Sequence, residues 1–269
     1  MSDMRELDER PSPAGVYDAA LGGTANTAAD RALIEHARLV MPHVIDGAWA
    51  NRGFLQRAVK RLASEWNIGQ FIDLGAGMPT QRNTHEVVTE VRPDGRVVYV
   101  DQDPRVIALA SRLLAGVDGT AVVQADIRDP EAILGHPETR RLIDFDEPVG
   151  LLMVAVTHFL PDSDDPWAVV RRYVDAIAPG SYLVLSAVTS DRQEETWQSV
   201  LEPGRPQGYE GFPRTLAQVE RFFDGLPIVP PYPGAEPAVA HVGLWGAEDP
   251  ELADDDGSRL AYAAVARKP

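Results

Sequence analysis

One short segment of this sequence, residues 71–79, carries the clearest signs of chemistry. A short apolar run is followed by Asp73, and then by Gly75 and Gly77 with one residue between them. A buried strand that opens into a Gly-x-Gly turn lets the backbone approach a ligand closely. A dinucleotide-binding fingerprint needs a third glycine, but Thr80 stands at that position. No lysine follows at the spacing of a triphosphate-binding loop, so the turn fits neither class of phosphate site.

A second acidic residue ends the next predicted strand. The apolar run 96–100 leads into Asp101, about one βαβ unit after Asp73. An acid at this place can accept hydrogen bonds from both hydroxyls of a ribose. Asp103 competes for the role, but it precedes Pro104, which is typical of a helix N-cap followed by the first helical residue. We therefore predict that Asp101 binds a ribose and that Asp103 caps a helix.

We expect a catalytic side chain directly after the fourth predicted strand, 149–156. Its continuous apolar composition is typical of a central strand that is buried on both faces. His158 follows it, and an imidazole with a pKa near neutrality can act as a base or an orienting group. Asp162 could orient that ring. The alternative is a histidine that only hydrogen-bonds locally at the strand end.

The elements that position these residues indicate an α/β protein. Between residues 67 and 189, five strands alternate with helices, which predicts a doubly wound, mostly parallel sheet. Residues 1–66 look helical and precede this core, which we expect to span 67–269. Thr215 should cap a helix that runs through Phe223, and 228–229 and 260–266 are the last predicted strands. The Pro- and Gly-rich stretch 227–257 is predicted to be an irregular surface excursion.

Composition excludes several classes of function. The chain has 269 residues, a formal net charge of −16 and no cysteine. Such a charge argues against a nucleic-acid substrate. The one candidate basic cluster, Arg52, Arg57, Lys60 and Arg61, is interpreted mostly as the wet face of an amphipathic helix. Neither a signal peptide nor an apolar run of about 18 residues is visible, so we expect a cytoplasmic protein. The histidines show no metal-ligand spacing, and we predict no metal. The oligomeric state is left open.

The order of these motifs resembles that of the class I methyltransferases that use S-adenosylmethionine. The acid two places before Gly75, without a third glycine, is similar to their motif I. More narrowly, four segments resemble a bacterial, mainly actinobacterial family of predicted S-adenosyl methyltransferases with unknown substrate. They are residues 10–23, 50–55, 101–104 and 155–165. The resemblance implies a Rossmann-like, seven-stranded sheet with its last strand antiparallel. It also implies S-adenosylmethionine as cofactor and S-adenosylhomocysteine as product.

The same resemblance implies a set of site residues. The loop under the amino-acid end of the cofactor would comprise Asp73, Gly75, Ala76 and Gly77, with Asp101 and Gln102 at the ribose. Asp126 would meet the adenine amino group beside Ile127, and a solvated loop acid is the alternative for Asp126.

The N-terminal helical segment would cover this site. Tyr17, Gly22 and Gly23 would then line it, and Tyr17 would help to exclude water from the reaction. A packed N-terminal arm with no role in binding is the alternative. Arg52 has two alternative roles. It either lies on the solvent-exposed face of its helix or binds the carboxylate of the cofactor, because a guanidinium can bind a carboxylate bidentately.

Methyl transfer from a sulfonium requires mainly that the acceptor atom lies close to the methyl group and in line with it. We therefore predict a methyltransferase that acts on a small molecule by in-line transfer. A binding or regulatory module of the same fold, without turnover, is the alternative. An oxidoreductase with a nucleotide cofactor is disfavoured by the missing third glycine.

Overall fold

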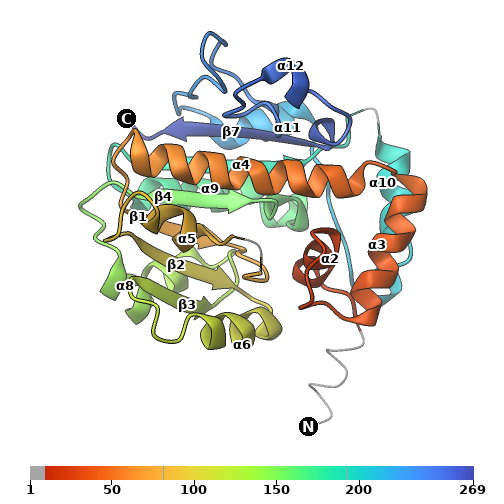
Figure 1. The fold of residues 1–269 in the computed structure, drawn as a ribbon, viewed down its shortest axis with the longest axis horizontal. Helices are drawn as coiled ribbons and strands as arrows, with labels where there is room; N and C mark the ends of the chain where they lie inside the picture. Colours follow the sequence, from red (N-terminus) through yellow and green to blue (C-terminus); the bar gives the residue numbers. More distant parts are fainter. Residues whose placement is uncertain (1–9, 81, 192) are drawn as a thin grey trace.

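The computed structural model describes residues 10–80, 82–191 and 193–269. Within these ranges the strands form one sheet in the order β3-β2-β1-β4-β5-β7-β6 (Figure 1). The first five strands of this order are parallel, and β7 runs antiparallel to both of its neighbours. The strands are β1 Gln70–Leu74, β2 Arg96–Asp101, β3 Thr120–Gln124, β4 Gly150–Val154, β5 Tyr182–Val188, β6 Ala240–His241 and β7 Ala261–Arg267. The predicted mostly parallel, seven-stranded sheet is confirmed.

The central strands are apolar on both faces because helices cover both faces. In β4, Leu151 and Met153 pack into one apolar cluster, whereas Leu152 packs into the cluster on the opposite face. One face is covered by α4 Val44–Ser64, α5 Thr84–Thr89 and α6 Pro104–Leu113. The other face is covered by α7 Pro130–Leu134, α8 Pro137–Leu142, α9 Pro166–Ala176 and α11 Leu216–Glu220, with the 3-10 turn η4 Arg221–Phe223.

Two predicted helix starts are confirmed by their caps. The Asp103 carboxylate accepts a hydrogen bond from the backbone nitrogen of Arg105 at 2.8 Å, and Pro104 is the first residue of α6. Thr215 forms a reciprocal capping box with Gln218 at the start of α11. Both caps satisfy backbone N–H groups that have no partner inside their helix.

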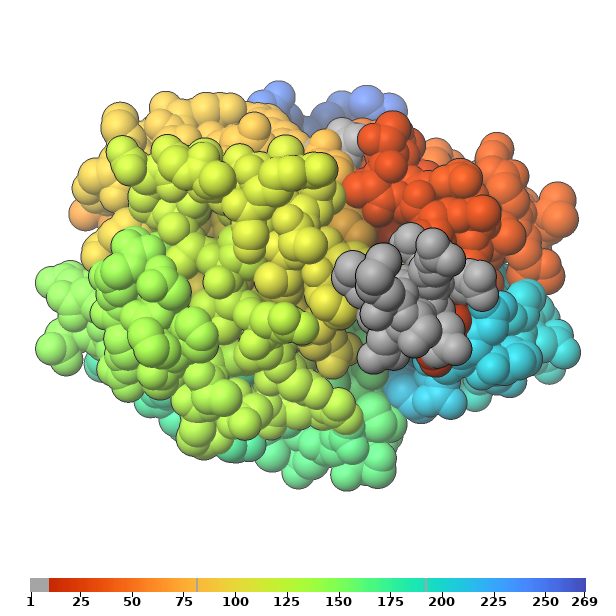
Figure 2. All heavy atoms as spheres, turned by 90° about the horizontal axis from the view of Figure 1, so that it is seen from below, coloured from red at the N-terminus to blue at the C-terminus, as the bar shows by residue number. Residues whose placement is uncertain are grey.

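A third apolar cluster lies beyond one end of the sheet. It joins α2 Pro13–Ala20, α3 Ala28–Val40 and α10 Glu194–Leu201, and the His36 Nε2 lies 3.0 Å from the Ser199 carbonyl oxygen across two of them. Figure 2 shows the N-terminal helices (red) beside the segment around residue 200 (cyan) at this end. Because α4 packs on the sheet, α2 and α3 are the only helices among the described residues of the expected segment 1–66 that pack apart from the two clusters of the sheet.

The prediction for the sixth strand is wrong. Ile228 forms only an isolated bridge to Ala266, and β6 lies instead at Ala240–His241. Pro230 and Pro231 follow directly, and proline cannot donate to a sheet ladder, so the pairing ends there.

The stretch 227–257 is not a simple surface excursion. Trp245 is fully buried against α4, and its carbonyl oxygen accepts a hydrogen bond from Arg57 Nε at 2.8 Å.

Arg52 of α4 is also buried, at 7% exposure. The interpretation as a wet helix face is therefore wrong for Arg52 and Arg57, whereas Lys60 is exposed as expected.

The remaining elements are short. They are α12 Pro250–Ala253 and the 3-10 turns η1 Thr157–Phe159, η2 Asp162–Asp164, η3 Arg205–Gln207 and η5 Ser258–Leu260. None of the helices in the described ranges has both the length and the apolar character that crossing a bilayer requires. The same residues contain no cluster of acidic and histidine side chains that could hold a metal ion.

Candidate active site

A cavity of about 340 Å³ begins at the carboxyl ends of β1 to β4 and continues beneath α2, α3 and α10. Ligands of open α/β sheets bind at this edge. The cavity brings together most of the residues predicted from the sequence. These lining residues are Tyr17, Arg52, Asp73, Gly75, Ala76, Gly77, Asp101, Gln102, Asp126, Ile127 and His158.

The two glycines of the loop after β1 serve different purposes. Both have left-handed backbones, with φ of 72° at Gly75 and 67° at Gly77. A Cβ at Gly75 would lie 2.3 Å from Val156 Cγ2, so this glycine is needed for packing against the segment after β4. A Cβ at Gly77 would meet no atom within 4 Å. Because Gly77 lines the cavity, that open space allows a ligand to lie close to the backbone.

Asp101 fixes this loop from the end of β2. Its Oδ2 accepts a hydrogen bond from the Gly77 nitrogen at 2.9 Å, and its Oδ1 accepts one from the Asp103 nitrogen at 2.9 Å. The side chain is nearly buried, and this burial raises the pKa of Asp101 above its usual value. A carboxylate has about four acceptor positions, so it retains capacity for further donors from a ligand.

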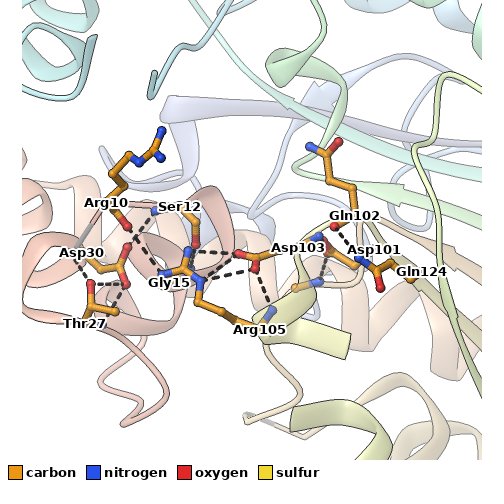
Figure 3. A network of polar contacts seen from close by, with 11 residues as sticks. Arg10, Ser12, Gly15, Thr27, Asp30, Asp101, Gln102, Asp103, Arg105 and Gln124 are labelled. Atoms are coloured by element: carbon orange, nitrogen blue, oxygen red, sulfur yellow. Dashed lines mark hydrogen bonds and ion pairs between the residues drawn. The ribbon is translucent and has the colours of Figure 1, made fainter. Parts of the chain in front are cut away.

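The N-terminal segment is docked next to this acid, as Figure 3 shows. The Arg105 guanidinium forms an ion pair with Asp103 at 3.0 Å and donates to the carbonyl oxygen of Arg10 at 3.5 Å. On the other side, the Ser12 nitrogen donates to Asp30 Oδ1 at 2.8 Å. The start of α2 is thereby held between α3 and α6, at the edge of the cavity.

Asp73 and Arg52 are two further buried charged residues of the cavity lining. Asp73 Oδ2 accepts a hydrogen bond from Thr84 Oγ1 at 2.7 Å, which ties β1 to the first turn of α5. Burial raises the pKa of Asp73 to about 6, against the opposing effects of Thr84 and of the Arg52 charge. The Arg52 guanidinium donates to the Arg82 carbonyl oxygen at 3.4 Å.

Asp126 has a partner that the sequence did not reveal. Its Oδ2 lies 2.5 Å from Arg128 Nη2, and Arg128 Nη1 also lies 3.0 Å from Asp164 Oδ2. The hydrogen bonds from Arg128 lower the pKa of Asp126. Ile127 is fixed beside it, because its carbonyl oxygen accepts a hydrogen bond from the Tyr173 hydroxyl at 2.9 Å.

His158 lines the cavity as a neutral ring. Burial, and secondarily the charge of Arg214, lower the pKa of His158 to about 3. The backbone N–H of Val188 donates to its Nδ1 at 3.4 Å, which leaves the ring proton on Nε2. Asp162 does not orient this ring as expected. Its carboxylate forms an ion pair with the buried Arg214 guanidinium, which lies 52 residues further along the chain.

A chain of hydrogen bonds connects the N-terminal helix to the end of β4. Asn51 Nδ2 donates to the Tyr17 hydroxyl at 2.9 Å, and Ser186 Oγ donates to Asn51 Oδ1 at 2.6 Å. Ser186 Oγ also accepts from the Ala155 nitrogen at 3.0 Å. Ala155 has a φ of 56°, a left-handed conformation that costs about 1–2 kcal/mol for a residue other than glycine. Asn51 and Ser186 were not predicted as site residues, although Asn51 lies within the family-like segment 50–55.

Gly22 and Gly23 are absent from the cavity lining that the described residues form. A Cβ at Gly23 would lie 2.0 Å from Asp18 Oδ1, so this glycine makes room for the buried Asp18 carboxylate. That carboxylate accepts hydrogen bonds from Asn26 Nδ2 at 2.8 Å and from the Thr80 hydroxyl. For Gly22 and Gly23 the structure favours the alternative of a packed N-terminal arm. The hydrogen bond between Asp18 and Thr80 connects this arm to the loop that follows Gly77.

Comparisons with known proteins agree with this architecture. A sequence model of the S-adenosyl methyltransferase family matches residues 2–269. A protein of Thermobifida fusca YX with the provisional name methyltransferase is 42% identical, with 97% of each chain covered and a TM-score of 0.88. A DUF574 family protein of Streptomyces avermitilis MA-4680 is 37% identical, with 98% of this chain and 100% of that chain covered and a TM-score of 0.89.

A more distant likeness concerns the fold alone. An O-methyltransferase family 2 protein of Planctomyces limnophilus DSM 3776, in complex with apigenin, is 16% identical. The match covers 90% of this chain and 66% of that one, with a TM-score of 0.50. Among the curated proteins, none matches this chain.

The cavity fits the cofactor that this family uses. The open direction at Gly77 leaves room for a ligand against the backbone, and the buried Asp101 carboxylate offers acceptors at the end of β2. Four aspartates and two arginines line this end of the cavity, and this acidic excess suits a ligand with a sulfonium charge. The chain belongs to the S-adenosyl methyltransferase family, and S-adenosylmethionine is its cofactor.

Proposed function

We propose that this methyltransferase transfers the methyl group to a small molecule held in the part of the cavity beneath α2, α3 and α10. The observation that carries the proposal is the continuity of the cavity, which runs from the acidic strand ends to this apolar part. When bound, the cofactor supplies an electrophilic methyl group. The cavity allows an acceptor to lie next to it.

The predicted cofactor residues that line the cavity keep their assignments within this proposal, whereas Gly22 and Gly23 do not. Asp101 and Gln102 would bind the ribose, and the loop from Asp73 through Gly77 would pass beneath the amino-acid end. Asp126 and Ile127 would contact the adenine, with Arg128 holding the Asp126 carboxylate in place. Arg52 would bind the cofactor carboxylate, because a buried guanidinium in the cavity wall is suited to a bidentate contact.

The protein contributes alignment and exclusion of water rather than a strong base. His158 is neutral at neutral pH, and its low pKa makes it a poor proton acceptor. With Nδ1 occupied by Val188, its Nε2–H is suited to donate to an oxygen or nitrogen of the acceptor. We therefore assign His158 to orientation, and Tyr17 to closing the cavity from the side of α2.

A macromolecular acceptor is disfavoured. The formal net charge of −16 opposes the approach of nucleic acid. The hydrogen bonds of Arg105 and Asp18 also hold the N-terminal arm across the cavity. A cytoplasmic pool of metabolites is the expected source of the acceptor.

Release of S-adenosylhomocysteine is the experiment that tests this function. The enzyme would be incubated with S-adenosylmethionine and fractions of a small-molecule extract, with an Asp101→Asn variant as the control. We expect product above background with the wild-type protein in some fractions, and much less with the variant. Cofactor binding without release in any fraction would favour a binding module over an enzyme.

A further inference from the structure

The part of the cavity beneath the N-terminal helices has a distinct chemical character. Its walls come from α2, α3, the start of α4, the turn after β4, the end of β5, α10 and the segment 209–213. Aliphatic side chains such as Val16, Ile34 and Val200 line it, together with the aromatic rings of Phe159, Trp197 and Tyr209. We call this part of the cavity the acceptor chamber.

Charge is distributed unequally along the cavity. The charged side chains of its lining are Arg52, Asp73, Asp101, Asp103, Asp126 and Arg128, and all of them belong to the cofactor end. Among the described residues that line the acceptor chamber there is no Asp, Glu, Lys or Arg. This contrasts with a chain in which 25% of the residues are charged.

The polar groups in the chamber are few and neutral. Tyr17, Asn51 and Ser186 bind one another, so their hydrogen-bonding capacity is largely used within the protein. His158 is neutral, and burial raises the pKa of Tyr209, so its phenol also stays neutral. A charged ligand would lose its hydration here and contact no opposite charge among the described residues that line the chamber.

Three of the ring side chains in the chamber lie next to one another. The ring centroids of His158 and Phe159 lie 4.4 Å apart, and those of Phe159 and Tyr209 lie 6.1 Å apart in an edge-to-face arrangement. The aliphatic side chains of α2 and α3 also line the chamber. A flat, apolar molecule would be contacted by rings and by aliphatic groups.

From these observations we infer that the acceptor is an uncharged, largely apolar compound, with a ring system that packs against His158, Phe159 and Tyr209. The inference rests on the proposed function, because it takes the chamber as the acceptor site. It adds the chemical class of the acceptor, and it excludes carboxylates, phosphate esters and free amines that are charged at neutral pH.

A matched pair of fluorescent probes tests the inference on the wild-type protein. N-phenyl-1-naphthylamine is uncharged, and 8-anilino-1-naphthalenesulfonate has the same ring system with an added sulfonate. We expect the uncharged probe to bind at one site per chain and the sulfonate to bind at least about tenfold more weakly, since its charge would be buried unpaired. Equal or tighter binding of the sulfonate would overturn the inference.

Variants locate the bound probe. Val188 is half-buried in the chamber wall, so Val188→Asp places a carboxylate there, whereas Val188→Thr has nearly the same shape without charge. The uncharged probe should bind Val188→Asp at least about tenfold more weakly than Val188→Thr.

Leu39, which is 85% exposed on α3, provides a control for surface binding. Leu39→Asp should bind the probe like the wild type, and loss of binding there would place the probe on the surface and overturn the assignment.

Calorimetry with S-adenosylmethionine separates the two proposals. If the wild-type protein binds the cofactor but does not prefer the uncharged probe, only the inference about the acceptor fails. If the protein does not bind the cofactor, the proposed function fails, whatever the probes show. The comparison of the two probes requires no variant, so misfolding of Val188→Asp would not remove the test.

Discussion

The side-chain amide of Asn51 donates a hydrogen bond to the Tyr17 hydroxyl, with 2.9 Å between nitrogen and oxygen. Asn51 belongs to α4, which packs on the sheet, whereas Tyr17 belongs to α2, which covers the cavity. Through Ser186, the same asparagine is connected to the strained backbone of Ala155 at the end of β4. One polar side chain therefore links the cover of the cavity to the end of β4, which lines the cavity.

Removing the Tyr17 hydroxyl should weaken this link. Tyr17→Phe leaves the buried Asn51 amide without one acceptor, which costs about 1–3 kcal/mol of the free energy of unfolding. We also expect weaker cofactor binding, because α2 is held less firmly. Tyr262→Phe is the matched control, since that hydroxyl donates to Asp191 at 3.0 Å outside the cavity. Urea unfolding and calorimetry measure both effects, and identical cofactor affinities for the two variants would contradict the role of Tyr17.

Replacing the two glycines after β1 by alanine should have different effects on stability and on cofactor binding. At Gly75 the new Cβ would clash with Val156, so Gly75→Ala should damage the fold itself, and the larger Gly75→Val more so. At Gly77 the Cβ has space, so Gly77→Ala should lose only about 1–2 kcal/mol of stability from its left-handed backbone. Because the added methyl group would occupy ligand space, we expect Gly77→Ala to lose cofactor binding while it remains folded.

Gly116→Ala is the control for this backbone effect. Gly116 has a φ of 80°, and a Cβ added there would meet no atom within 4 Å. It follows the end of α6 and lies outside the cavity lining that the described residues form. The variant should lose similar stability in thermal unfolding and keep full cofactor affinity in calorimetry. If Gly77→Ala also keeps full affinity, the loop does not touch the cofactor.

The buried Asp73 predicts an unusual dependence of stability on pH. Its pKa rises from 3.8 to about 6 on folding, so the folded state binds its proton more tightly than the unfolded state. The stability that this proton provides is present below about pH 4 and is lost as the pH rises through 6, about 3 kcal/mol in all. Relative to Asp73→Asn, the wild type should thus become less stable over this range in urea unfolding. Parallel pH curves for the two proteins would show that Asp73 is not desolvated.

His158 should show the opposite sign. Its pKa falls from 6.5 to about 3 on folding, so the unfolded state binds the proton first. Relative to His158→Gln, the wild type should lose roughly 2 kcal/mol of stability between pH 6.5 and pH 5. Glutamine can still accept from Val188 and donate to an acceptor, so turnover should fall less than the about 10²–10⁴ typical of a lost general base. A loss within that larger range would restore the base assignment.

The sequence was sufficient where local patterns determine structure. The apolar runs predicted the five parallel strands, and Asp103 and Thr215 marked helix starts because their side chains satisfy adjacent N–H groups. The spacing of Asp73, Gly75 and Gly77 predicted the loop that lines the cavity. Each of these features depends on residues that are close together in the chain.

Features that depend on distant residues were not predictable. Asp162 was expected to orient His158, but it pairs with Arg214, which approaches from a later segment. The low pKa of His158 reflects burial, which a single sequence does not reveal. The two-residue strand β6 is too short to show a period, and the acceptor chamber forms only when α3 and α10 meet.

Calorimetric titration of S-adenosylmethionine into the wild-type protein and Asp101→Asn tests the central claim, that the cofactor binds at the end of β2. An asparagine cannot accept hydrogen bonds on both of its terminal atoms, so contacts to the ribose or to Gly77 must be lost. We predict roughly ten- to a hundredfold weaker binding by this variant, from a loss of about 1.5–3 kcal/mol. Asp129→Asn, at the cap of α7 outside the cavity, should bind like the wild type, and NAD should not bind. Unchanged affinity in a folded Asp101→Asn would contradict the account.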